Sequence, residues 1–127
     1  MIKYDCHFDA SYTPGICRGG FCISKGSSLE KQSVRTLGAN TSDMAEAEIL
    51  HKLLDYINLK IERGKRVCIY GDAQGLIISI LRGNKGSDRY KNVRKKYKKM
   101  CTFYDLSIEF IPREKNKRAD ALSKHRL

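Results

Sequence analysis

The first part of the chain alternates apolar and polar residues with the period of a half-buried β-strand. Every second residue from Ile2 to Phe8 is apolar, and two shorter strand-like runs follow at 20–23 and 31–37. Residues that favour tight turns, mainly glycine and serine, separate these runs. The pattern therefore predicts a three-stranded antiparallel meander whose first strand ends at Asp9.

From Thr41 onward the apolar positions take the period of an α-helix. Asp43 and Glu46 have the spacing of a capping box, and we expect the helix that they open to run to about Glu62. The apolar stripe of this helix consists of Ile49, Leu50, Leu53, Leu54, Ile57 and Ile61. Glu46 shares the face of that stripe, so its carboxylate is expected to point toward the sheet.

The remainder of the chain predicts two further strands and three further helices. They are a strand at 67–70, a helix at 73–81, a helix from 87 or 88 to about 104, a strand at 106–111 and a terminal helix capped by Asn116. The order βββαβααβα places the chain in the α/β class, with a five-stranded mixed sheet that joins the antiparallel meander to two parallel strands and is flanked by helices. A length of 127 residues leaves room for one core, so we expect residues 1–127 to form a single domain.

Positive charge is concentrated in the last third of the chain. Residues 1–81 carry 10 Lys and Arg against 9 Asp and Glu, whereas residues 82–127 carry 15 against 5. The net charge of +11 therefore comes almost entirely from the second segment. Such an asymmetry favours nucleic acid as the partner, with an acidic membrane surface and plain solubility as the other interpretations.

Two classes of protein are disfavoured by the sequence. No apolar run approaches the ~18 to 20 residues that a membrane span needs, and the N-terminus lacks the apolar stretch of a signal peptide, so we expect a cytoplasmic protein without a membrane partner. The five cysteines are an odd number without a Cys-x2-Cys pair, which argues against a disulfide framework and a zinc site. We expect reduced thiols.

Four acidic residues lie where the predicted elements begin or end. Asp9 and Asp72 follow strands, and Glu46 and Asp120 lie in the first turns of helices. Each has an ordinary structural interpretation as a turn residue, a capping residue or a charge near a helix N-terminus. As a cluster they suit Mg²⁺ or Mn²⁺, and two such ions can hold the attacking and leaving oxygens of a phosphoryl displacement. A basic protein with that site is a candidate nuclease.

Four sequence motifs follow one another on these elements. They are Phe8-Asp9-Ala10-Ser11 with Gly19-Gly20-Phe21, then Ala45-Glu46, then Tyr70-Gly71-Asp72-Ala73-Gln74, and finally the segment from Ile111 to Ser123 that contains Asp120. With these motifs the chain resembles type 1 ribonuclease H, and more closely the short branch of that family described as reverse-transcriptase-like. The resemblance spans nearly the whole chain.

The resemblance implies a ribonuclease H-like fold and hydrolysis of the RNA strand of RNA/DNA hybrids, which leaves 5′-phosphate and 3′-hydroxyl ends. It implies two Mg²⁺ or Mn²⁺ ions per site, held by catalytic carboxylates that map onto Asp9, Glu46, Asp72 and Asp120. By this analogy Asp9 would bridge both ions, while Asp120 would help to hold one of them and Glu46 and Asp72 the other. The expected partner is the hybrid, with no small-molecule cofactor, and the protein is expected to act as a monomer.

Nucleic-acid contacts are expected at two groups of residues. The resemblance places Gln74 against the RNA minor groove, and Ser11, Thr41 and Ser42 are the other expected contacts near the carboxylates. The second group lies on the cationic face of the helix that begins near residue 88, and consists of Lys91, Arg94, Lys95 and Lys98. A solvated helix face would have the same pattern.

The chain departs from the family at three positions. Ala10 stands where glycine is usual, Ser42 and Asp43 stand where an Asn-Asn pair is common, and no histidine lies between Leu106 and Ala119. The alternative function is a catalytically silent module that keeps the fold and binds a hybrid or a protein partner.

Overall fold

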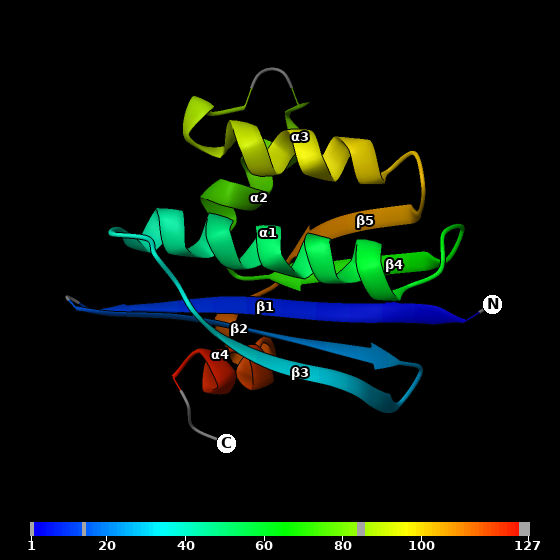
Figure 1. Cartoon of the computed structure of the whole chain (residues 1–127), viewed down its shortest axis with the longest axis horizontal. Coiled ribbons are helices and arrows are strands. Elements are labelled where there is room, and N and C mark those ends of the chain that lie inside the picture. The colour runs from blue at the N-terminus through cyan, green and yellow to red at the C-terminus, as the bar shows by residue number, and fades with distance from the viewer. Residues whose placement is uncertain (1, 14, 84–85, 125–127) are drawn as a thin grey trace.

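The computed structural model describes residues 2–13, 15–83 and 86–124 and contains a five-stranded sheet of order β3-β2-β1-β4-β5 (Figure 1). The strands are β1 (Lys3–Thr13), β2 (Ile16–Lys25), β3 (Ser28–Thr36), β4 (Arg66–Gly71) and β5 (Asp105–Phe110). β1, β2 and β3 pair antiparallel, whereas β4 pairs parallel with both β1 and β5. The predicted meander with two added parallel strands is confirmed.

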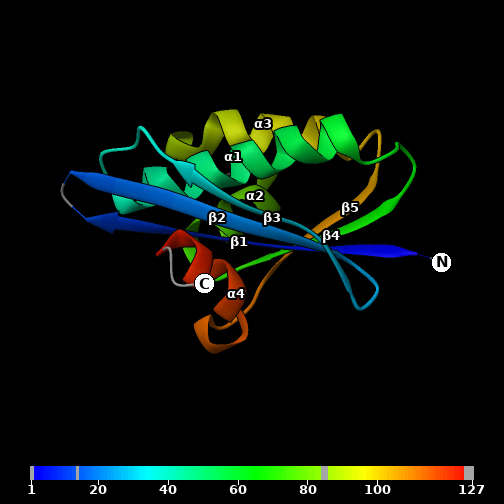
Figure 2. The ribbon, with the colours of Figure 1, turned by 60° about the horizontal axis from the view of Figure 1, so that its bottom comes forward.

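Helices cover both faces of this sheet. They are α1 (Ser42–Lys60), α2 (Gln74–Leu81), α3 (Lys91–Met100) and α4 (Lys117–Ser123), with short 3-10 turns at Asp88–Tyr90 and Arg113–Lys115. Figure 2 shows α1, α2 and α3 on one face and α4 on the other. The predicted order βββαβααβα is confirmed, and no helix of the described residues has the length and apolarity of a membrane span.

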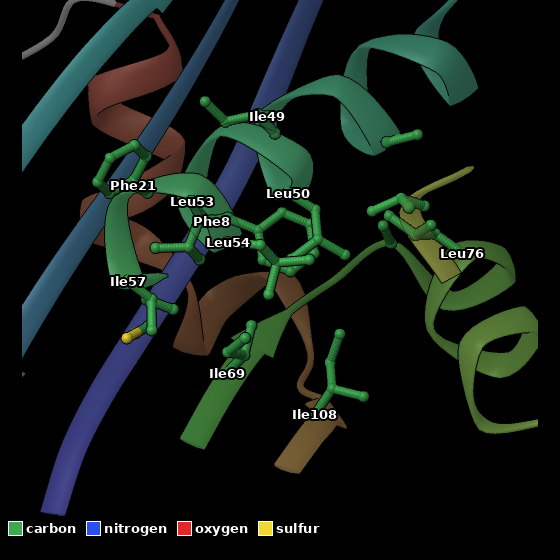
Figure 3. Packing of buried hydrophobic residues seen from close by; sticks show 14 of the residues in the cluster. Phe8, Phe21, Ile49, Leu50, Leu53, Leu54, Ile57, Ile69, Leu76 and Ile108 are labelled. Carbon is green, nitrogen blue, oxygen red and sulfur yellow. The ribbon is translucent and has the colours of Figure 1, made fainter. Parts of the chain in front are cut away.

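The main core lies between α1 and the sheet (Figure 3). All six residues of the predicted apolar stripe of α1 are buried, and Leu50 and Leu53 have no exposed surface. They pack with Phe8 of β1 and Ile69 of β4 in one cluster. Each such side chain contributes about 1.5 to 3 kcal/mol by leaving water, so this packing fixes α1 on the sheet.

The first strand is longer than predicted from the sequence. Asp9 lies inside β1, where it pairs with Gly20 of β2, and the ladder continues to the pair of Thr13 with Ile16. The prediction that the strand ends at Asp9 is therefore wrong. The turn-favouring residues between Ser11 and Gly15 suggest a loop, but the alternation of apolar and polar residues continues through Ala10 and Tyr12, and the hairpin extends with it.

Helix capping also differs from the prediction. The hydroxyl of Thr41 accepts the backbone N–H of Met44 at 3.2 Å, so α1 is capped by Thr41 and the predicted Asp43–Glu46 capping box is wrong. Asn116 stands at the N-cap position of α4, but its side chain makes no capping bond. Its amide instead donates to the carbonyl of Phe8 at 2.9 Å, which joins α4 to β1.

A glycine on β2 allows α4 to lie close to the sheet. A Cβ atom on Gly20 would come within 2.5 Å of the Leu122 Cβ and 2.8 Å of the Ser123 backbone nitrogen. Leu122 is itself 1% exposed, so neither it nor the backbone behind it has room to move away. Because Gly20 pairs with Asp9, this close approach also sets how far α4 lies from Asp9.

We expect the substitution Gly20→Ala to destabilise the fold by about 2 kcal/mol, since it overpacks a contact that includes backbone atoms. Urea denaturation monitored by circular dichroism measures the change. Gly75→Ala is the matched control, because nothing lies within 4 Å of a Cβ at that position in α2 and alanine favours helix. Equal stability of the Gly20→Ala variant and the wild type would contradict the proposed role of this contact.

Candidate active site

Three of the four predicted carboxylates line one pocket at the end of the central strands. Asp9 comes from the middle of β1, Asp72 directly follows β4, and Glu46 lies near the start of α1. The pocket has a volume of about 490 Å³, and its other lining residues are Ala10, Phe110, Pro112 and Arg113. β1 and β4 pair parallel with His7 opposite Tyr70, so Asp9, two residues farther along β1, lies level with Asp72 just beyond the end of β4.

Asp9 has the most perturbed carboxyl group in the pocket. Its residue is 6% exposed. Burial, followed by the charge of Asp72 and the adjacent carboxyl of Asp120, raises the pKa of Asp9 to about 8. A hydrogen bond from the backbone N–H of Ala10 to Oδ1, at 2.9 Å, offsets part of this effect. The surroundings of Asp9 therefore do not balance a negative charge, and without a cation its carboxyl group is mostly protonated at neutral pH.

Glu46 shows the same effect to a smaller degree. Burial raises the pKa of Glu46 to about 7, and the charges of Asp72 and Asp43 add to the increase. The predicted orientation of Glu46 toward the sheet is thus consistent with a position among the other acids. Its carboxylate does not serve as a capping group, because Thr41 caps α1.

Asp120 reaches the same cluster from α4, on the other face of the sheet. Its Oδ1 lies 2.9 Å from Nζ of Lys124 and 3.6 Å from a guanidinium nitrogen of Arg113. Burial raises the pKa of Asp120, but hydrogen bonds with Lys124 and with the carboxyl group of Asp9 outweigh that effect and lower it overall. The structure therefore brings all four predicted carboxylates together, with Asp120 the only one that is paired with cations among the described residues.

The chemistry of this donor set fits hard divalent cations. In the described ranges no group of three or more Asp, Glu, His or Cys side chains is arranged to hold a metal ion as it stands. The fit follows instead from the three carboxylates that line one partly buried pocket, where burial, and after it repulsion by the charge of Asp72, raises the pKa of both Asp9 and Glu46. A divalent cation among oxygen donors would relieve that repulsion, and Mg²⁺ and Mn²⁺ prefer such donors.

Sequence reasoning missed two cationic residues of the site. Arg113 lines the pocket, and its side chain is 69% exposed, so most of its N–H donors remain available. In the sequence Arg113 lies within the motif from Ile111 to Ser123, but the motif alone assigned it no role. Lys124 follows Asp120 by four residues on α4, a spacing that could have been read as an ion pair on one helix face.

The residues expected to contact nucleic acid near the carboxylates are on the surface or partly exposed. Gln74 is exposed at the start of α2, two residues after Asp72, and Ser11 is partly exposed on β1, two residues after Asp9. Thr41 and Ser42 are exposed at the start of α1. The hydroxyl of Thr41 accepts the backbone N–H of Met44 and keeps its own O–H to donate, so both hydroxyls of this pair can donate to a phosphate.

The four residues of α3 that are expected to contact nucleic acid differ in their surroundings. Lys91, Lys95 and Lys98 are exposed, and the described residues place no acidic group in an ion pair with them. Arg94 instead donates to the carbonyl of Ser87 at 2.7 Å and to the hydroxyl of Ser79 at 3.3 Å. Arg94 thus fastens the loop between α2 and α3.

All five cysteines are free thiols, and only Cys101 is exposed, as the sequence predicts for a chain without a disulfide framework.

Comparison with known proteins identifies the fold. A family model described as reverse transcriptase-like matches residues 8–126. No curated protein sequence matches the chain. Among solved structures, RNase H1 of the halophilic archaeon Halobacterium salinarum superposes with a TM-score of 0.83 at 22% identity, over 98% of this chain and 96% of that one.

Two further structures are similar. The N-terminal RNase H domain of Rv2228c from Mycobacterium tuberculosis has a TM-score of 0.79 at 18% identity, covering 99% of this chain and 94% of that one. LC11-RNase H1, isolated from compost, was solved in complex with an RNA/DNA hybrid. It has a TM-score of 0.78 at 19% identity, covering 96% of this chain and 94% of that one. The expected ribonuclease H fold is confirmed.

We expect Asp9→Asn to stabilise the metal-free protein at alkaline pH. Because folding raises the pKa of Asp9 from 3.8 to about 8, this group does not reduce the stability below the lower value and reduces it progressively as the pH rises toward the higher one. The amide does not ionise, so the variant's free energy of unfolding should exceed that of wild type by about 1 to 3 kcal/mol at pH 8 and by almost nothing at pH 4. Urea denaturation with EDTA measures both. The same difference at the two pH values would contradict this account.

Proposed function

Since the chain belongs to the reverse transcriptase-like family, whose model covers residues 8–126, we propose that it is a metal-dependent endoribonuclease that hydrolyses the RNA strand of RNA/DNA hybrids. The observation that carries this proposal is the convergence of four carboxylates from β1, α1, the end of β4 and α4 on one site. A binding module gains nothing from packed negative charge beside a phosphate chain. The hybrid bound to the similar LC11-RNase H1 supports the choice of substrate.

The proposed metal ligands are Asp9, Glu46, Asp72 and Asp120. A pair of Mg²⁺ or Mn²⁺ ions held there would stabilise the attacking and leaving oxygens of an in-line displacement, which leaves 5′-phosphate and 3′-hydroxyl ends. Asp9 interacts with both Asp72 and Asp120, so it is the carboxylate suited to contribute to both halves of the site. The raised pKa values of Asp9 and Glu46 mean that cations compete with protons near neutral pH.

Arg113 is proposed to orient the scissile phosphate. Its guanidinium lines the pocket beside the carboxylates and is largely exposed, so it can donate two parallel hydrogen bonds to phosphate oxygens. No histidine lies between Leu106 and Ala119, and Arg113 is the fixed positive charge that the segment brings to the pocket. Unlike an imidazole, it keeps its charge at all relevant pH values.

Substrate recognition is proposed at the rim of the pocket and on α3. Gln74 and Ser11 are close enough in sequence to the carboxylates to contact the RNA strand, where the 2′-hydroxyl distinguishes RNA from DNA. Lys91, Lys95 and Lys98 would neutralise phosphates farther along the duplex. Arg94 is not proposed as a phosphate contact, since its donors hold the loop before α3.

We expect Asp72→Asn to reduce cleavage of a labelled RNA/DNA hybrid in Mg²⁺ by at least about a hundredfold, since an amide cannot supply the charge that the ions require. Binding of the hybrid and the melting temperature should change little, because the side chain keeps its shape. Asp88→Asn, at an exposed acid before α3, is the control and should cleave normally. Hybrid binding without cleavage by the wild type in either metal would replace the proposal by a silent hybrid-binding module.

We expect the triple substitution of Lys91, Lys95 and Lys98 by Glu to weaken hybrid binding and to flatten its salt dependence. Each lost phosphate contact should reduce the slope of log K against log salt by roughly 0.9 if the hybrid behaves like duplex DNA. Fluorescence anisotropy at several salt concentrations measures the slope.

The control is a charge-matched variant at the opposite end of the sheet from the carboxylates. Lys60 ends α1, whereas Glu46 lies near the start of that helix. Lys65 precedes β4, whereas Asp72 follows it. Lys25 ends β2 and pairs with Tyr4 near the start of β1, whereas Asp9 lies farther along that strand. Replacing these three lysines by Glu should lower affinity much less. Equal slopes for both variants would show that α3 only contributes to the overall charge.

A further inference from the structure

The ion pair between Lys124 and Asp120 is the closest cationic contact of any carboxylate in the site. The ammonium nitrogen of Lys124 lies 2.9 Å from Oδ1 and 3.2 Å from Oδ2 of Asp120, so it covers both oxygens. Both side chains are 25% exposed, and the two residues are four apart on α4. The pair is therefore partly shielded from water, which strengthens it relative to a surface pair.

The other three carboxylates have no such partner. Within the described ranges, no Lys, Arg or His nitrogen lies within 4.0 Å of an oxygen of Asp9, Glu46 or Asp72. Arg113 is a second cation near Asp120, but at 3.6 Å and 69% exposure its contribution is screened. Of the four carboxylates, Asp120 is thus the one that has cationic side chains beside it within the described residues.

We propose that Lys124 is an internal counter-cation of Asp120, so that one divalent ion binds at Asp9, Glu46 and Asp72 while a second binds only by displacing Lys124. This inference rests on the proposed function, because it takes the carboxylates to be metal ligands. Once all four carboxylates are ionised, as metal binding requires, Lys124 and Arg113 leave a net charge of −2, which a single divalent ion neutralises. A second ion must first take Asp120 from the ammonium group.

Displacement of Lys124 is physically accessible. Its four-carbon stem is flexible and its ammonium group is well hydrated, so the head group can move into water when a cation replaces it. The loss of the ion pair then opposes the second ion, but not the first. The dissociation constants of the two ions should therefore differ by more than the repulsion between the ions alone would cause.

Binding of Mn²⁺ to the metal-free protein tests this inference without nucleic acid. Free Mn²⁺ is measured by electron paramagnetic resonance while the ion is added to the wild type and to Lys124→Met, which keeps the length and apolar stem of the side chain. We expect the second ion to bind the variant about tenfold more tightly, and the first ion to bind both proteins within about twofold. The melting temperature in EDTA verifies that the variant is folded.

Two variants separate the ion pair from a general change of charge. Lys117→Met removes the same charge from an exposed position on α4 and should leave both dissociation constants as in the wild type. Lys124→Arg keeps a cation beside Asp120 and should retain the weak second site. An equal effect of Lys117→Met and Lys124→Met would overturn the inference, since it would show a long-range charge effect.

The remaining outcomes distinguish this inference from the proposed function. If the wild type binds Mn²⁺ and Lys124→Met does not change the second dissociation constant, the counter-cation role is wrong and the metal site stands. If neither protein binds Mn²⁺, the metal site and the inference both fail. Asp9→Asn, measured in parallel, should lose the first ion, which identifies the site that is being titrated.

Discussion

Asp9 lies on the central strand of the sheet with 6% of its surface exposed, and three other acidic residues meet it there. Burial of this charge opposes folding, so the elements that carry the four carboxylates must be held by contacts elsewhere. The apolar face of α1 holds Glu46 against the sheet. The close approach of α4 at Gly20, together with the bond from Asn116 to the carbonyl of Phe8, holds Asp120 on the opposite side.

The basic residues of the last third of the chain have different structural roles, although all of them contribute to the net charge. Arg94 fixes a loop and Lys96 pairs with Asp55 of α1, so both support the packing of α3. Lys124 pairs with Asp120, within the site itself. The exposed lysines of α3 remain for a polyanion. The net charge of +11 already subtracts the acids in these pairs, so what the contacts limit is which of the basic side chains are free to contact a substrate.

The elements that could be predicted from the sequence are those with one buried face, because burial imposes a periodic pattern of apolar residues. The stripe of α1 is entirely buried because a 3.6-residue period directly reflects one apolar face. The end of β1 was mispredicted because turn-favouring residues from Ser11 onward suggest a loop, whereas their backbone pairs with β2 as far as Thr13. The cap at Thr41 and the role of Arg94 depend on hydrogen bonds that local patterns do not specify. The four acidic residues could be predicted because the motifs that contain them follow one another in the same order as in the family that the chain resembles.

The bond between Asn116 and Phe8 joins residues 108 positions apart in the chain. Contacts with such a large sequence separation carry the greatest loop-closure entropy, and they tend to form late in folding. Asp9 and Asp120 come together through the same long-range closure. A nascent or partly folded chain can thus hold β1 to β4 and α1 in place and still lack a complete set of carboxylates, so that the site is assembled only after α4 has been synthesised and packed.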